Sequence, residues 1–169
     1  MNVKVFGFGL AAACVSLAAS GPPAHATYRL FSAMACTGSG MNSLMYANDG
    51  QASNCGANSV WLQCPVDVGS SFNPLTSATI TLYGWGYTPA NNLDKVATQA
   101  CRVYAGGGGG TCGSGVQSGN SGATFAIQPN AAAWSQASQT TDARLLVVFL
   151  PGVSSSGSCD GIWSYSVTY

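Results

Sequence analysis

The sequence predicts an all-β fold, an antiparallel β-sandwich of about seven strands stapled by disulfides. Short runs rich in Val, Ile, Thr, Tyr and Trp recur along the chain and alternate with clusters of Gly, Asn, Ser and Pro. No stretch longer than ten residues carries the 3.6-residue apolar period of a helix without such breakers. Six of the seven cysteines follow residue 26, and an even set of this kind is typical of a small disulfide-stabilised domain.

The expected strands follow one another at short intervals. In the run 59–66 the even-numbered residues from Val60 would share one face, while Trp61 and Gln63 would face the other way, as in a half-buried antiparallel strand. Pro65 lacks an amide donor, so we expect pairing to end there or to lie at a sheet edge. The seven expected strands are 28–35, 59–66, 78–87, 95–104, 123–127, 144–150 and 161–169.

The run 145–150 is apolar on both faces, which predicts a central strand covered on each side. A short buried helix is the alternative, but the β-branched residues and the terminating Pro151-Gly152 favour a strand. We expect this strand at the centre of the core.

Residues 1–26 have the features of an export signal. Lys4 precedes an apolar stretch over 5–19, and helix-breaking residues then lead to the small-x-small sequence Ala24-His25-Ala26, so we expect cleavage after Ala26. The apolar stretch is about 15 residues long, short of the roughly 20 that cross a bilayer. Cys14 raises the alternative of a lipid anchor, although Leu10 lies one position too far upstream for that signal. We therefore expect a secreted protein with a single domain over 27–169.

Loss of the signal changes the chemistry that is available. The remaining 143 residues contain no Glu and no His, because the one His of the chain is His25. Four basic residues face five aspartates, giving a net charge of about −1, so no basic field exists to attract nucleic acid or anionic lipid. Without His, neither a Ser-His-Asp nor a Cys-His nucleophile system can be assembled. We expect no catalytic residue and no cofactor.

The aspartates leave two alternatives open. A pair of them could serve a glycosidase, although most lie beside turn-forming residues, where aspartate ordinarily caps turns. The segments Asn48-Asp49-Gly50 and Cys159-Asp160-Gly161 could offer oxygen ligands to calcium, although neither has EF-hand spacing. We predict no metal site. The five aspartates are Asp49, Asp67, Asp94, Asp142 and Asp160.

The six remaining cysteines allow 15 disulfide pairings in principle. Cys101 and Cys112 bracket the glycine run 106–110, and a strand that turns at the glycines would bring these sulfurs opposite each other. For the other four we expect Cys36 with Cys64 and Cys55 with Cys159. A zinc site is disfavoured because the chain has no Cys-x-x-Cys pair.

Several short motifs together resemble a loose group of short secreted bacterial proteins, β-rich and disulfide-bonded, whose function is uncharacterised. The motifs are Ala35-Cys36, Cys64-Pro65-Val66, Ala100-Cys101-Arg102, Leu150-Pro151-Gly152 and Ser164-Tyr165-Ser166-Val167. The resemblance implies a sandwich and export, and it implies no activity. That group often has a cysteine before the Leu-Pro pair, where this chain has Phe149, which agrees with a different partner for Cys101.

The aromatic residues are the feature most open to a functional interpretation. Along 78–87 the alternation places Tyr83, Trp85 and Tyr87 opposite the core residues Ile80 and Leu82, so three aromatic side chains would face solvent. Such a row can stack on the flat apolar side of a sugar ring. Asn91 and Asn92 follow as partners for sugar hydroxyls, and Trp163, Tyr165 and Tyr169 would make a second row on the last strand. The alternative is that these rings pack between the sheets or under loops.

These observations predict a secreted, non-catalytic protein that acts as a surface or matrix component or as a ligand-binding module. The second hypothesis is a carbohydrate-binding module that uses Tyr83, Trp85 and Tyr87, with an extracellular glycan as partner. The third is a small secreted enzyme of unfamiliar type.

Overall fold

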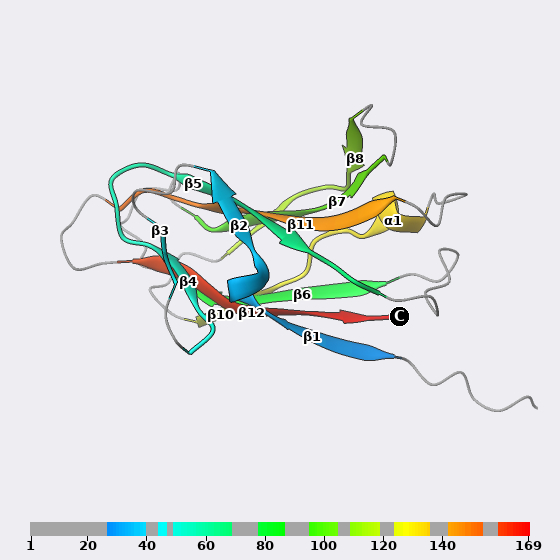
Figure 1. Cartoon of the computed structure of the whole chain (residues 1–169), viewed down its shortest axis with the longest axis horizontal. Helices are drawn as coiled ribbons and strands as arrows, with labels where there is room; N and C mark the ends of the chain where they lie inside the picture. The colour runs from blue at the N-terminus through cyan, green and yellow to red at the C-terminus, as the bar shows by residue number, and fades with distance from the viewer. Residues whose placement is uncertain are drawn as a thin grey trace, which may run out of the picture.

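In the computed structural model, the described part of the chain forms twelve strands in two six-stranded antiparallel sheets (Figure 1). The structure describes residues 27–39, 44–46, 49–68, 78–86, 95–104, 109–118, 124–135, 142–153 and 159–169. The expected export signal, including Cys14, lies outside these residues. The antiparallel β-sandwich predicted from the sequence is therefore observed, although the expected number of about seven strands was too low.

Sheet A has the strand order β10-β6-β12-β4-β3, and β1 pairs with the far end of β12. Its strands are β1 (Tyr28–Ser32), β3 (Leu44–Tyr46), β4 (Ala52–Asn54), β6 (Thr79–Trp85), β10 (Thr124–Ile127) and β12 (Asp160–Thr168).

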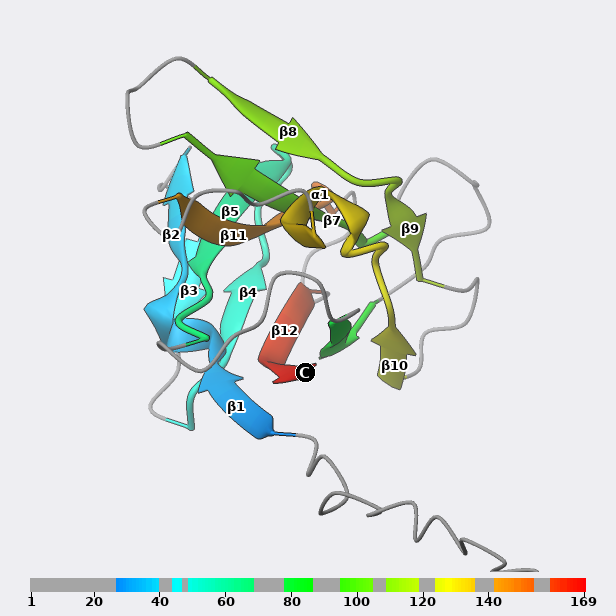
Figure 2. The same ribbon diagram turned by 90° about the vertical axis from the view of Figure 1, so that its right-hand side faces the viewer.

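Sheet B has the order β2-β5-β11-β7-β8, and β9 also pairs with β7. Figure 2 shows β8 and β9 one after the other along β7, at the edge of this sheet. Its strands are β2 (Thr37–Ser39), β5 (Val60–Pro65), β7 (Ala97–Val103), β8 (Gly110–Cys112), β9 (Val116–Gln117) and β11 (Ala143–Leu150).

The core lies between the two sheets and is built from alternate residues of each. Sheet B contributes Leu62, Leu146 and Val148, and sheet A contributes Ile80, Leu82 and Ile162, all fully buried. Burial of these apolar side chains supplies the main driving force for the association of the sheets, about 1.5–3 kcal/mol for each.

The short helix α1 (Ala132–Ser135) closes one side of the core. The side-chain oxygen of Asn130 accepts a hydrogen bond from the amide of Ala132 at the start of the helix. Trp134 is buried, and its indole N–H donates to the carbonyl of Cys101 at 3.0 Å, which holds α1 against β7.

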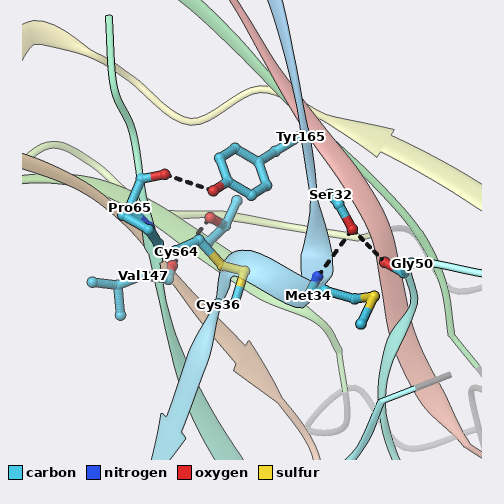
Figure 3. The surroundings of a disulfide bond; sticks show 9 residues. Ser32, Met34, Cys36, Gly50, Cys64, Pro65, Val147 and Tyr165 are labelled. Atoms are coloured by element: carbon cyan, nitrogen blue, oxygen red, sulfur yellow. Dashed lines mark hydrogen bonds between the residues drawn. A yellow bond between two sulfur atoms is a disulfide. The ribbon is translucent and has the colours of Figure 1, made fainter. Parts of the chain in front are cut away.

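The strand expected over 28–35 ends at Ser32, and the chain continues as a 3-10 turn, η1 (Ala33–Ala35). The Ser32 hydroxyl accepts from the amide of Met34 at 3.2 Å and donates to the carbonyl of Gly50 at 3.1 Å (Figure 3). These bonds favour the turn over a longer strand, because they satisfy the amide that a strand would pair. At this turn the chain passes from β1 in sheet A to β2 in sheet B.

The described residues contain three disulfides, Cys36–Cys64, Cys55–Cys159 and Cys101–Cys112, which are the pairs expected from the sequence. Cys36–Cys64 ties the crossover after η1 to β5, as Figure 3 shows. Cys55–Cys159 joins the end of β4 to the start of β12, and Cys101–Cys112 is a cross-strand pair of β7 and β8.

Strand β11 is central in sheet B, as predicted, but only one of its faces belongs to the core. Leu146, Val148 and Leu150 are fully buried, whereas Val147 and Phe149 are only half-buried on the opposite face. The prediction of a strand covered on both sides was therefore wrong. No layer of strands or helices in the described part of the chain covers this outer face.

Candidate functional site

Tyr83 and Trp85 lie on the outer face of sheet A. The burial of β6 alternates along the strand, with Ile80, Leu82 and Gly84 buried and Tyr83 and Trp85 half-buried on the other side. Neither ring packs between the sheets, because the inward positions are taken by the residues on either side of them. Tyr87, Asn91 and Asn92, the other residues predicted for this site, lie outside the described residues.

A third aromatic side chain joins these two because β12 contains a β-bulge. The pairing register of β12 with β6 shifts between Ile162 and Ser164, so Trp163 is the extra residue. Ile162 and Tyr165 consequently both face the core, although they are three positions apart. Trp163 stacks on Trp85 with ring centroids 5.4 Å apart and an interplanar angle of 25°. We call Tyr83, Trp85 and Trp163 the aromatic surface.

The second aromatic row predicted for the last strand is not formed, because the bulge divides its three members between two faces. Tyr165 is fully buried and stacks on Phe31 at 5.0 Å. Its hydroxyl donates to the carbonyl of Pro65 at 2.6 Å (Figure 3). Burial raises the pKa of Tyr165 to about 12. Tyr169 packs at the edge of the core and donates to the carbonyl of Val68. Both tyrosines therefore stabilise the fold, and only Trp163 faces outward.

The Trp85 ring lies directly on the backbone of its neighbouring strand. Gly161 is the cross-strand partner of Trp85, and a Cβ built on Gly161 would lie only 2.4 and 2.5 Å from two ring carbons of Trp85. A glycine is needed at this position because any side chain would occupy the space of the ring. The close contact with the Gly161 backbone and the stack with Trp163 thus hold Trp85 in place.

Hydroxyl groups occupy the outer face next to the aromatic surface. Cross-strand pairing places Ser164 beside Tyr83 and Thr168 beside Thr79, while Ser166, the partner of Thr81, is only 3% exposed. On the other side of β6, Gln128 donates to the Thr81 hydroxyl at 3.3 Å. The described outward positions of β6, of β12 after its bulge and of β10 carry no charged side chain. The result is a neutral surface with apolar rings at one end and hydroxyl donors and acceptors along the rest.

The described aspartates are each engaged separately. Asp142 pairs with Arg102, Asp67 lies 3.9 Å from Arg29, and Asp49 accepts from Gln51. Asp160 is buried at the start of β12, with its Oδ1 close to Gly86. None of these contacts joins two carboxylates, and the described residues contain no group of three His, Cys, Asp or Glu side chains that could hold a metal ion. Among the same residues, no helix has the length and apolar character needed to cross a membrane.

Known proteins resemble this chain in fold rather than in sequence. The xylan-binding module CBM15 superimposes with a TM-score of 0.51 over 85% of this chain and 97% of its own, at 12% identity. Weaker likenesses are found to the CBM36-1 domain of a multidomain xylanase from the hindgut metagenome of Trinervitermes trinervoides (TM-score 0.43, 14% identity, 85% and 97% covered) and to the xylan-binding module CBM86 of Roseburia intestinalis (0.43, 14%, 83% and 94%). No family model and no curated protein matches the sequence. The first likeness identifies a shared β-sandwich fold.

Proposed function

We propose that this protein is an exported, non-catalytic carbohydrate-binding module that holds a neutral polysaccharide on the outer face of sheet A. The observation that carries the proposal is the Trp85–Trp163 stack on an uncharged, hydroxyl-bearing sheet face. Tyr83 is the next outward-facing residue of β6 and extends the same surface along that strand. Tyr87, Asn91 and Asn92 are proposed to continue the site beyond Trp85.

A sugar ring matches such a surface chemically. One side of a pyranose is flat and apolar and packs on an indole or phenol ring, while its rim of hydroxyl groups needs hydrogen-bond partners. Trp85 and Trp163 supply the rings, and Ser164 and Thr81 supply hydroxyls within the same sheet. The lack of charged side chains on the described part of this face favours a neutral glycan over an acidic one.

Rigidity supports the same conclusion. Trp85 is held by Gly161 and Trp163, so little rotamer freedom remains to be lost when a ligand binds. Since the module of shared fold is named for xylan binding, xylan is the first polysaccharide to test on this chain.

The test is native gel electrophoresis of the exported, disulfide-bonded protein in gels that contain soluble xylan, β-1,4-galactan or β-glucan. Retardation by at least one of them is expected for the unaltered protein. Trp85→Ala and Trp163→Ala should weaken binding at least about ten-fold, because a tryptophan at the centre of a binding site typically contributes more than about 2 kcal/mol. Met34→Ala is the control, since it removes an apolar side chain that is 53% exposed on η1. Full retardation of both tryptophan variants would contradict the proposed site, and no retardation in any gel would contradict the function.

A second candidate function, a surface or matrix component that self-assembles, is favoured by one observation. Tyr28 and Leu30 on β1 are 59% and 61% exposed, and β1 pairs only with β12 in the described part of the chain. An exposed strand with apolar side chains can pair with another chain. Sedimentation of the native protein and of Leu30→Lys separates the two functions, because only assembly predicts a larger native species that the lysine disperses.

A further inference from the structure

The outer face of sheet B also carries a tryptophan, Trp61. The alternation of β5 turns Val60, Leu62 and Cys64 into the core and leaves Trp61 on the opposite side, where it is 49% exposed. Its cross-strand partner on β11 is Phe149, and the two rings meet in a tilted arrangement with centroids 4.9 Å apart. Phe149 therefore fixes the position of the indole while about half of Trp61 stays in contact with solvent.

A hollow of about 350 Å³ lies beside Trp61, across the outer face of sheet B. The residues that line it include Val147 of β11, Ala97 and Gln99 of β7, and Gln117 of β9. Gly115 completes the wall close to Gln99: a Cβ on Gly115 would be 3.0 Å from the Gln99 side chain. We call this feature the Trp61 hollow. Its volume is at the small end of the range of about 300–1,000 Å³ typical of ligand sites.

The chemistry of the Trp61 hollow selects one class of ligand. All of the described residues that line it are uncharged, so nothing there attracts an ion. Gln99 and Gln117 are exposed, and a primary amide both donates and accepts hydrogen bonds. An exposed indole next to two such amides fits a ligand that has a flat apolar side and several hydroxyl groups. A neutral sugar unit of a polysaccharide has both.

We infer that the Trp61 hollow is a second glycan-binding site, separate from the aromatic surface, so that one molecule can hold two polysaccharide chains. The two sites lie on the outer faces of opposite sheets, and the core separates them (Figure 1). A single chain segment therefore cannot lie flat on both. The class of ligand rests on the proposed function, whereas the existence and position of the site rest on the geometry of sheet B.

The experiment measures the two sites independently in the disulfide-bonded protein. Soluble xylan and β-1,4-galactan are the probes, with gel retardation as the measure of binding and turbidity with long chains as the measure of bridging. Trp61→Ala and the double variant Gln99→Ala/Gln117→Ala are compared with Trp85→Ala and with the control Met34→Ala. The double variant alters two exposed side chains outside the core, so it tests the hollow even if the loss of Trp61 disturbs folding.

Trp61→Ala and the double glutamine variant are expected to abolish turbidity, because a molecule with one remaining site cannot bridge two chains. Their retardation is expected to fall, relative to Met34→Ala, to the level that the aromatic surface gives alone. Undiminished retardation and turbidity in both would overturn the inference. Loss of binding in the hollow variants with full binding in Trp85→Ala would uphold the hollow and reject the site proposed on sheet A. If Trp61→Ala changes only the sedimentation of the protein and leaves glycan binding intact, the hollow is an interface between two copies and the inference is overturned.

Discussion

Gly161→Ala tests whether the aromatic surface depends on one missing side chain. The added Cβ would lie 2.4 and 2.5 Å from ring carbons of Trp85, where carbon atoms in contact are about 3.5–4.0 Å apart. It would also lie 2.9 Å from the carbonyl oxygen of Ala52, a backbone atom that cannot retreat easily. Trp85 is on the solvent side of the sheet, so the ring must lift away from β12 by about 1 Å.

The cost of this overpacking is about 1–3 kcal/mol of unfolding free energy, which corresponds to a fall in Tm of about 3–10 °C for a domain of this size. The stack with Trp163 should be lost at the same time, because it depends on the position of the displaced ring. Thermal unfolding measures the first effect, near-ultraviolet circular dichroism of the tryptophans the second, and retardation in polysaccharide gels the consequence for binding.

Gly86→Ala is the matched control for this substitution. It adds the same methyl group one residue after Trp85, but its nearest neighbour is the Oδ1 of Asp160 at 3.2 Å, a side-chain atom that has to give by only a few tenths of an ångström. We expect a cost below about 1 kcal/mol and an unchanged tryptophan spectrum. If Gly161→Ala unfolds at the temperature of the unaltered protein and keeps its tryptophan signal, Trp85 is not seated on β12 as described.

Two further predictions concern stability. Replacing Cys55 and Cys159 by Ala should lower the free energy of unfolding by about 4.8 kcal/mol, and replacing Cys101 and Cys112 by about 2.8 kcal/mol, because the closed loops span sequence separations of 104 and 11 residues. Urea unfolding under oxidising conditions measures both losses. Equal losses would contradict the loop-entropy explanation. The second prediction follows from the raised pKa of about 12 of Tyr165 in the folded protein, against about 10 in the unfolded chain. As the pH rises, the Tyr165 hydroxyl of the unfolded chain loses its proton before that of the folded protein. The contribution of Tyr165 to the free energy of unfolding should therefore be fully present below pH 10 and decline between about pH 10 and 12. Tyr165→Phe should show a smaller decline in denaturant titrations across that range, and an identical decline would mean that other groups cause it.

The outward direction of Tyr83 and Trp85 could be predicted because a strand alternates with a strict period of two. Once Ile80 and Leu82 are assigned to the core, the residues between them must face outward. The same rule failed on the last strand. Trp163, Tyr165 and Tyr169 share the parity of one face, but a single extra residue in the ladder reverses the parity beyond it, and its position depends on the pairing of β12 with β6.

The strands that were not predicted are short, and two of them, β2 and β4, are also largely polar. Thr37–Ser39 and Ala52–Asn54 have few of the β-branched or aromatic residues that mark strands, and each has three residues. They become strands because β5 and β12 offer them unpaired backbone groups, which is a property of the assembled sheets. The Trp61 hollow was missed for a related reason: Trp61, Gln99 and Gln117 lie on β5, β7 and β9, far apart in the chain.

The fold class and the outward face of β6 could be predicted from composition and local alternation, and the glycine run predicted the Cys101–Cys112 pair. For Cys36–Cys64 and Cys55–Cys159 the sequence left other pairings open, and the structure established these two bridges. Which aromatic side chains share a face depends on how the strands pair in the assembled sheets. Trp163 reaches Trp85 through a bulge, and the outer side of β11 stays open because the described elements cover only its inner side. Both outcomes depend on pairing between distant strands, which local sequence does not encode.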